Sequence, residues 1–243
     1  MTAANLPEHA GNAIHSNAGA IAAGFPAALV AGVTTYAYLT HPCVAAWGEA
    51  WLHHGTAELR LRAPVFAAEV VDCVPRAGGF SGSASHIVID AICRTRSPEP
   101  RATLVASLDA RPPPSRRPGE QLPSRSVQLT GLFGNDYGLR AGDDLAIYPD
   151  RRLAHPAVWP AIANLMYASE QVRGAWIHTR SVIRHHALVP DGVTVDVHAN
   201  VVDRFHRGGL RAVTEFVFER AGEVLVTLEH EAIVELDPPE RVP

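Results

Sequence analysis

Ala20-Ile-Ala-Ala-Gly-Phe-Pro-Ala-Ala-Leu-Val-Ala-Gly-Val-Thr-Thr-Tyr-Ala-Tyr-Leu39 is apolar along nearly its whole length. Gly24, Pro26 and Gly32 interrupt it, whereas a membrane-spanning helix needs about 20 consecutive apolar residues. We therefore expect a helix over residues 29–39 that is buried on most of its sides, with the preceding residues as its lead-in. The stretch predicts the central core helix of a globular domain.

Short strands are expected after this helix. Pro42 should end the helix, because proline lacks the N–H that an interior helical position donates, and residues 44–53 should form a second amphipathic segment. Four short segments then partly alternate apolar and polar residues, with turn residues between them: residues 57–62, 69–74, 86–93 and 102–108. This alternation predicts an antiparallel sheet with one solvated face.

A proline- and arginine-rich segment, Arg111-Pro-Pro-Pro-Ser-Arg-Arg-Pro-Gly119, divides the chain and is typical of an extended, solvated linker. After it the same order of elements returns. We expect a mainly apolar helix over residues 153–172 and strands over residues 176–185, 193–203, 211–219 and 223–236. The predicted organisation is an N-terminal unit over residues 1–110, a linker over residues 111–126 and a C-terminal unit over residues 127–243.

The two halves also echo each other in sequence. Trp51-Leu-His-His-Gly-Thr-Ala-Glu-Leu-Arg60 and Trp176-Ile-His-Thr-Arg-Ser-Val-Ile-Arg184 each follow a predicted helix. Together with one helix and four strands in each half, this echo predicts the duplication of a single α+β unit. Another α+β arrangement is the alternative that the pattern leaves open.

Short motifs in both halves carry a resemblance to a known family. Asn12-Ala-Ile-His15, followed by Gly24-Phe-Pro and Gly32-Val-Thr-Thr-Tyr36, resembles the active-site loop and central helix of the MaoC-like (R)-specific hydratase/dehydratase group of hotdog-fold proteins. His155-Pro, Asn164 and Gly174-Ala-Trp-Ile-His178 are similar to the matching segment of a second hotdog unit. The resemblance implies a double hotdog fold, in which an antiparallel sheet wraps a central helix in each half. It also implies acyl thioesters of coenzyme A or acyl carrier protein as substrates.

The loop before the first helix combines groups suited to proton transfer and carbonyl polarisation. Histidine exchanges a proton near neutral pH, so His15 is the candidate acid or base, and the amide of Asn12 could orient a water or the imidazole. N–H groups at a helix start favour a developing oxyanion. By the resemblance, Gly32 and Val33 lie there and bind the thioester oxygen, although Gly32 could equally serve close packing. Tyr36 lies one turn further on, where a core role fits it better than catalysis.

The second half supplies further candidates. His155, Asn164 and His178 are polar residues in or beside its helix and the following strand. By the resemblance, hotdog thioesterases use a carboxylate on the central helix as base or nucleophile. Glu170, with Asn164 or Gln171 nearby, could take that part.

The loop departs from the family pattern in one respect. The (R)-specific hydratases carry roughly Asp-x-Asn-Pro-x-His, and their aspartate and histidine together activate water. Aligned on His15, this chain has Ala10 at the aspartate position and Ala13 at the proline position. Glu8 or a carboxylate from the second half could substitute. General acid–base partners typically contribute about 10²–10⁴-fold, so a weak, redirected or lost activity is compatible with the sequence.

Three functions follow from these observations. The leading one is reversible addition or removal of water at the α,β-position of an acyl thioester, with His15 moving the proton. The second is thioester hydrolysis through Glu170. The third is a non-catalytic hotdog protein that binds an acyl ligand or a partner subunit, for which Ala10 is the motivation.

Composition limits the remaining classes. With 243 residues, 47% hydrophobic and 19% charged, the chain is an ordinary globular protein, and its net charge of -4 gives no reason to expect a nucleic acid partner. Lysine is absent, which excludes a Schiff-base lysine. Cys43, Cys73 and Cys93 lack metal-ligand spacing, so we expect no metal and no cofactor. The start does not resemble a signal peptide, and we expect a cytoplasmic monomer or homodimer without a membrane partner.

Overall fold

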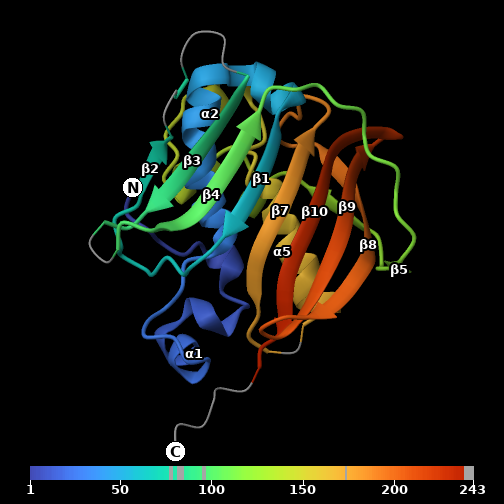
Figure 1. The fold of residues 1–243 in the computed structure, drawn as a ribbon. Coiled ribbons are helices and arrows are strands. Elements are labelled where there is room, and N and C mark those ends of the chain that lie inside the picture. Colours follow the sequence, from blue (N-terminus) through green and yellow to red (C-terminus); the bar gives the residue numbers. More distant parts are fainter. Residues whose placement is uncertain (77–78, 81–84, 95–96, 173, 238–243) are drawn as a thin grey trace, which may run out of the picture.

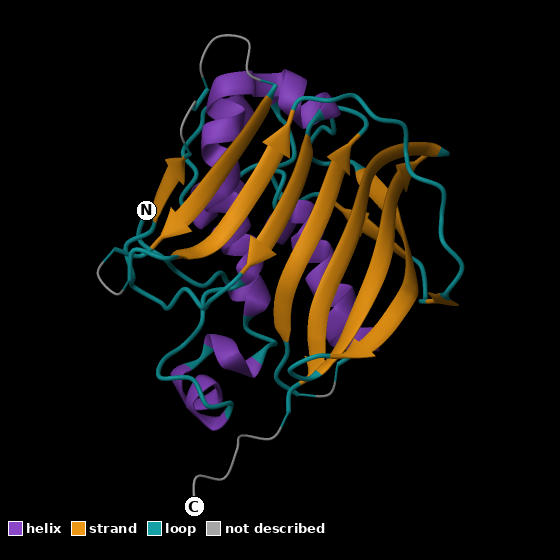
Figure 2. Cartoon of the chain, viewed as in Figure 1, coloured by secondary structure: helices purple, strands orange, loops and turns teal. Residues whose placement is uncertain are grey.

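The computed structural model describes the chain except residues 77–78, 81–84, 95–96, 173 and 238–243, so the end of the predicted C-terminal unit lies outside the described residues. All pairings between the described strands are antiparallel and join them into one ten-stranded sheet. The strand order is β2-β3-β4-β1-β7-β10-β9-β8-β5, and β6 also pairs with β8. The sheet curls around two helices, α2 and α5 (Figures 1 and 2).

The first half contributes one long helix and four strands. Before them come two short 3-10 turns, η1 (Pro7–His9) and η2 (Ala13–His15), and α1 (Asn17–Ala22). The long helix α2 (Gly32–His54) is followed by β1 (Thr56–Leu61), β2 (Asp72–Pro75), β3 (His86–Ile92) and β4 (Pro100–Ser107). The expected order of one helix and four strands is therefore present.

After five short elements, the second half repeats this order from α5 onward. Its elements are β5 (Glu120–Gln121), β6 (Arg125–Gln128), η3 (Gly131–Phe133), α3 (Tyr137–Ala141), α4 (Ile147–Arg151), α5 (Val158–Glu170), β7 (Ile177–His185), β8 (Thr194–His206), β9 (Leu210–Arg220) and β10 (Glu223–Glu235). Residues 111–119 carry no regular structure, whereas β5 and β6 pair with β8. The short elements over residues 120–151 have too little periodicity for the sequence pattern to have indicated them.

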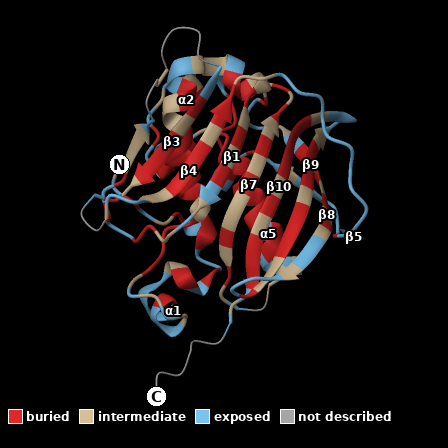
Figure 3. Cartoon of the chain, viewed as in Figure 1, coloured by how far each residue is buried: buried red, intermediate tan, exposed pale blue. Residues whose placement is uncertain are grey.

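Strands β1 and β7 join the two halves edge to edge, with Leu59 opposite Ser181. Buried positions alternate with more exposed ones along β1 and much of β7, so one face of the sheet packs on the helices (Figure 3). Trp51 on α2 and Trp159 on α5 are fully buried in this core. Truncating a buried tryptophan to alanine costs about 3–5 kcal/mol of folding free energy, so these helices anchor the sheet.

The predicted helix end at Pro42 is wrong. Helix α2 continues through Pro42 to His54. Proline removes a single helical hydrogen bond there, and tight burial of neighbours such as Leu39 and Cys43 keeps the helix in place. The backbone instead breaks at Gly48, whose φ of 56° and ψ of -140° are conformations that glycine adopts readily.

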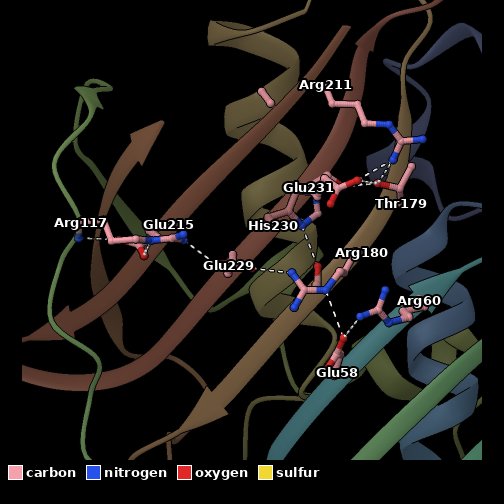
Figure 4. A network of polar contacts seen from close by, with 12 residues as sticks. Glu58, Arg60, Arg117, Thr179, Arg180, Arg211, Glu215, Glu229, His230 and Glu231 are labelled. Carbon is pink, nitrogen blue, oxygen red and sulfur yellow. Dashed lines mark hydrogen bonds and ion pairs between the residues drawn. The ribbon is translucent and has the colours of Figure 1, made fainter. Parts of the chain in front are cut away.

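Ion pairs cross the outer face of the sheet (Figure 4). Glu58 on β1 accepts hydrogen bonds from Arg60 at 2.6 Å and from Arg180 on β7 at 3.2 Å, which offsets the direct opposition of the two arginines in the β1–β7 register. Arg180 also pairs with Glu229, and Arg117 from the connecting segment pairs with Glu229 and Glu215. Such exposed pairs contribute about 0–1 kcal/mol each, so they orient this segment more than they stabilise the core.

None of the described helices is both long and apolar enough to span a membrane.

Candidate active site

A cavity of about 270 Å³ lies between the two halves. It brings together five of the residues predicted from the sequence: Asn12, His15, Gly32, Asn164 and His178. Its other lining residues come from the segment before α2 and the start of α2, from the end of β1 and the residues after it, and from the second half: Ile14, Phe25, Leu29, Val30, Thr35, Leu61, Arg62, Ala63, Pro64, Val65, Trp176, Ile177, Thr179, Arg211 and Ile233. The wall is mainly apolar with a few polar groups, as is usual for a small-molecule site.

Asn5 ties the His15 loop to the start of α2. Its Nδ2 donates to the carbonyl oxygens of Leu29 at 2.8 Å and His15 at 3.2 Å, and its Oδ1 accepts from the N–H of Ala31 at 3.0 Å. Ala31 is the N-cap residue of α2. One amide therefore fixes the distance between the candidate base and the helix start. Sequence reasoning missed Asn5, because it lies outside the motif and only the folded loop brings it there.

The hydrogen bonding of His15 sets its tautomer. Its Nδ1 lies 2.8 Å from the carbonyl oxygen of Leu29, which can only accept, so Nδ1 carries the proton. In the neutral ring Nε2 is then a hydrogen-bond acceptor, and no described residue donates a hydrogen bond to it. Burial lowers the pKa of His15, and the bond to Leu29 opposes this only in part. His15 is thus a neutral imidazole at neutral pH with Nε2 available as a base.

Asn12 lies in the cavity wall but its side chain is engaged elsewhere. Its Nδ2 donates to the carbonyl oxygen of Trp176 at 2.9 Å, and its Oδ1 caps the η2 turn through the N–H of Ile14 at 3.5 Å. Asn12 therefore connects the loop of the first half to the second half. Its Oδ1 keeps one lone pair that a water in the cavity could use.

The start of α2 faces the cavity through Gly32. A Cβ at this position would lie 2.3 Å from Cδ1 of Leu61 and 2.9 Å from Nδ1 of His178, so any larger residue would require one or both of these side chains to shift. The first turn of a helix has N–H groups without intrahelical acceptors, which leaves the Gly32 N–H available to a ligand. Val33 and Tyr36 are fully buried and do not line the cavity. Close packing and an open N–H are thus both properties of Gly32.

Two buried polar side chains reach the cavity from the second half. His178 on β7 is 6% exposed and Asn164 on α5 is 7% exposed. The Nδ1 of His178 and the Oδ1 of Asn164 have no hydrogen-bond partner among the described residues. Buried polar groups are nearly always paired, so both atoms point to a bound molecule or water.

His155 lies outside the cavity in a saturated polar cluster. Its Nε2 donates to Asp143 at 3.1 Å, and its Nδ1 accepts from the N–H of Ala157 at 3.1 Å. Asp143 also accepts from His41 at 2.8 Å and from Tyr148 at 3.3 Å. Burial by itself raises the pKa of Asp143, but the bonds from His155 and His41 outweigh it, and the pKa is lowered. This cluster holds α2 against α4.

Asp144 is a third potential metal ligand beside this cluster, with ligand atoms of His41, Asp143 and Asp144 within 4.8 Å of one another. Sequence spacing did not indicate this grouping, since 102 positions separate His41 from Asp143. Both oxygens of Asp143 already accept two hydrogen bonds each, from His41, the Leu145 N–H, Tyr148 and His155. Hydrogen bonding within the protein therefore accounts for the position of Asp143 beside His41.

The candidate carboxylates also lie away from the cavity. Glu170 pairs with Arg125 at 2.7 Å on the surface, and Glu8 accepts two hydrogen bonds from Arg140. Among the residues that the structure describes, no aspartate or glutamate lines the cavity. Glu231 accepts hydrogen bonds from two residues of the cavity wall, Arg211 and Thr179.

Comparison with known proteins identifies the fold. No protein-family model matches the chain, and no curated protein matches it in sequence. Among solved structures, a conserved hypothetical protein from Mycobacterium tuberculosis described as having a double hotdog fold is similar, with a TM-score of 0.60 and 13% identity over 96% of this chain and 93% of that one. A MaoC-like dehydratase has a TM-score of 0.54 and 14% identity over 91% and 88% of the two chains.

A third similar structure carries a different activity in its name. A Lactobacillus plantarum protein provisionally named an oleoyl thioesterase has a TM-score of 0.52 and 12% identity, over 86% of this chain and 91% of that chain. The names of these neighbours differ, and what they share is the architecture described above. This chain is therefore an α+β protein with the double hotdog fold.

Proposed function

We propose that this protein adds water reversibly to the α,β-double bond of an acyl thioester carried by coenzyme A or acyl carrier protein. The observation that carries the proposal is the hydrogen bond between Nδ1 of His15 and the carbonyl oxygen of Leu29, from which the tautomer of His15 follows. Its protonated Nδ1 is fixed on Leu29, and its Nε2 remains a base in a cavity bounded by the open helix start at Gly32. Dehydratase-like neighbours of the same fold support this choice of reaction.

The proposed steps use these two groups. The thioester oxygen accepts a hydrogen bond from the Gly32 N–H, where the partial positive charge of the helix start favours the developing enolate. His15 Nε2 takes a proton from water as the water oxygen bonds to Cβ. The imidazolium then returns that proton to Cα, the enolate collapses to the thioester, and His15 is neutral again. Dehydration follows the same steps in reverse.

The lack of a carboxylate in the described cavity wall predicts modest catalysis. A missing acid–base partner typically costs about 10²–10⁴-fold. The same observation favours one second candidate, a protein that binds an acyl thioester without converting it. Hydrolysis through Glu170 has less support, because that carboxylate pairs with Arg125 outside the cavity. The free cysteines Cys43, Cys73 and Cys93 fit a reducing cytoplasm, which we propose as the location.

The test is a panel of trans-2-enoyl thioesters of different chain length. Loss of enoyl absorbance measures hydration, and release of free thiol measures hydrolysis in the same sample. We expect absorbance loss without thiol release, abolished in His15→Ala and retained in His86→Ala, which removes an exposed histidine of β3. Binding without either signal would support the second candidate, and thiol release alone would replace hydration by hydrolysis.

A further inference from the structure

A chain of three hydrogen-bonded side chains lies behind the cavity wall. The Nε2 of His178 lies 2.8 Å from the hydroxyl of Ser181, and that hydroxyl lies 2.9 Å from Nδ1 of His230 on β10. The two imidazole rings stack with centroids 4.1 Å apart. Figure 4 shows His230 beside the strand that carries Arg180. Neither Ser181 nor His230 was indicated by any sequence motif.

A β-bulge makes this arrangement possible. Residues three apart on a regular strand face opposite sides of the sheet. Here the register with β10 shifts between Glu231 and Ala232, so that Arg180 and His178 pair with consecutive residues and Thr179 is the extra one. His178 and Ser181 are consequently both buried on the inner face. Bulges re-aim side chains near functional sites.

Both rings are neutral at neutral pH. Burial lowers the pKa of His178 to about 3, and a hydrogen bond with the backbone of Arg180 raises this pKa by a smaller amount. Burial also holds the pKa of His230 well below its usual value, and repulsion from His178 adds to this. Each ring therefore carries one proton, and the position of that proton depends on the direction in which the Ser181 hydroxyl donates.

Two directions exist. If Ser181 donates to His230, then His178 donates from Nε2, and the Nε2 proton of His230 is left without an acceptor in the core. If Ser181 donates to His178, then His230 donates from Nδ1, and only a lone pair is left at its Nε2. His230 is fully buried beside Tyr167 and Phe216, and its Nε2 has no hydrogen-bond partner among the described residues. Each direction thus leaves one N–H and one lone pair unpaired within the protein. The second direction moves the unpaired N–H from His230, which does not line the cavity, to His178, which does, so that a bound molecule can accept it, and this direction is favoured.

The favoured direction places a proton on Nδ1 of His178, the unpaired atom in the cavity wall. That atom lies beside the helix start, since a Cβ on Gly32 would be 2.9 Å from it. We propose that the Nδ1–H of His178 is a second donor to the thioester oxygen, next to the Gly32 N–H, with Ser181 and His230 as the positioning residues that fix its tautomer. This inference rests on the proposed function, because it concerns the same carbonyl group.

The first test reads the tautomers directly. In two-dimensional ¹⁵N–¹H spectra of the full chain, the long-range couplings of each imidazole distinguish a proton on Nδ1 from one on Nε2. We expect both His178 and His230 to carry it on Nδ1, assigned by comparison with single-histidine variants. A proton on Nε2 of His178 would overturn the inference.

The second test reads carbonyl polarisation with 4-(dimethylamino)cinnamoyl-CoA, whose absorption moves to longer wavelength when its carbonyl accepts strong hydrogen bonds. We expect a red shift on binding to the wild type, most of it lost in His178→Phe and partly recovered in His178→Asn, whose amide N–H replaces Nδ1. His185→Phe is the matched control, because His185 is a buried histidine of the same strand outside the cavity.

The outcomes separate the two proposals. An unchanged red shift in His178→Phe would overturn this inference and leave the proposed function standing. No binding to the wild type would overturn the proposed function and this inference with it. If His178→Phe does not fold, the tautomers and the red shift of His178→Asn decide: a proton on Nδ1 and a retained shift support the inference, and loss of either overturns it. One donor of such a pair typically contributes about 10²–10³-fold to turnover, and we expect a fall in kcat rather than a rise in KM.

Discussion

Replacing Gly32 by alanine tests the close contact between the start of α2 and the cavity wall. The new Cβ would lie 2.3 Å from Cδ1 of Leu61 and 2.9 Å from Nδ1 of His178. The leucine methyl can rotate away, but Ser181 holds the imidazole from behind at 2.8 Å. Overpacking of this kind costs about 1–3 kcal/mol, and the helix propensity of alanine returns up to about 1 kcal/mol. We expect a net loss of about 1–2 kcal/mol in the free energy of unfolding.

Urea unfolding measures this loss, with Gly11→Ala as the control because nothing lies within 4 Å of a Cβ there. The hydration assay measures the second effect. We expect kcat/KM to fall by about 10²-fold, because the methyl group displaces His178 and obstructs the Gly32 N–H. Adding Leu61→Ala should restore part of the stability but not the activity. If Gly32→Ala matched Gly11→Ala in both assays, the assignment of the helix start as the carbonyl site would be refuted.

Three further predictions concern the rest of the molecule. Burial lowers the pKa of His178 and His185 from 6.5 to about 3, so the unfolded chain binds more protons than the folded one between these values. The free energy of unfolding should therefore fall as pH drops below about 6.5, by up to about 1.4 kcal/mol per pH unit for each such histidine. Urea unfolding at pH 7.5 and 5.5 measures this, and equal unfolding midpoints at the two pH values would contradict it. Asn5→Ala should lower the free energy of unfolding by about 1–2 kcal/mol and reduce kcat, because three hydrogen bonds that align the His15 loop are lost; unchanged kcat would show that the alignment is unnecessary. Glu170→Gln should keep full activity on every thioester tested. A large loss of thiol release in this variant would instead support hydrolysis through this carboxylate.

The sequence predicted the helices and strands that have a periodic pattern of apolar residues, and it missed the elements without such a pattern. Alternation over residues 177–185 and the apolar helix around Trp159 follow from burial, which leaves a periodic pattern. The continuation through Pro42 and the break at Gly48 depend on packing, which outweighs local propensity. The short elements of residues 120–151 are held by tertiary contacts such as those of Asp143, which no local pattern indicates.

The site divides in the same way. A motif close in sequence indicated His15 and Gly32, and the cavity contains both. Asn5 and Ser181 act through contacts between segments that are distant in sequence or shifted by a bulge, so residue type and spacing could not indicate them. Glu170 shows the reverse, because a carboxylate at the expected place on the helix is turned to Arg125 at the surface.

The most direct test of the central claim compares His15→Asn with the wild type in hydration of the best enoyl thioester. The asparagine Nδ2 can replace Nδ1 and keep the hydrogen bond to Leu29, while Nε2 is lost. If His15 Nε2 is the base, kcat should fall by about 10²–10⁴-fold with the free energy of unfolding nearly unchanged. Wild-type turnover in His15→Asn would show that His15 only holds the loop in place.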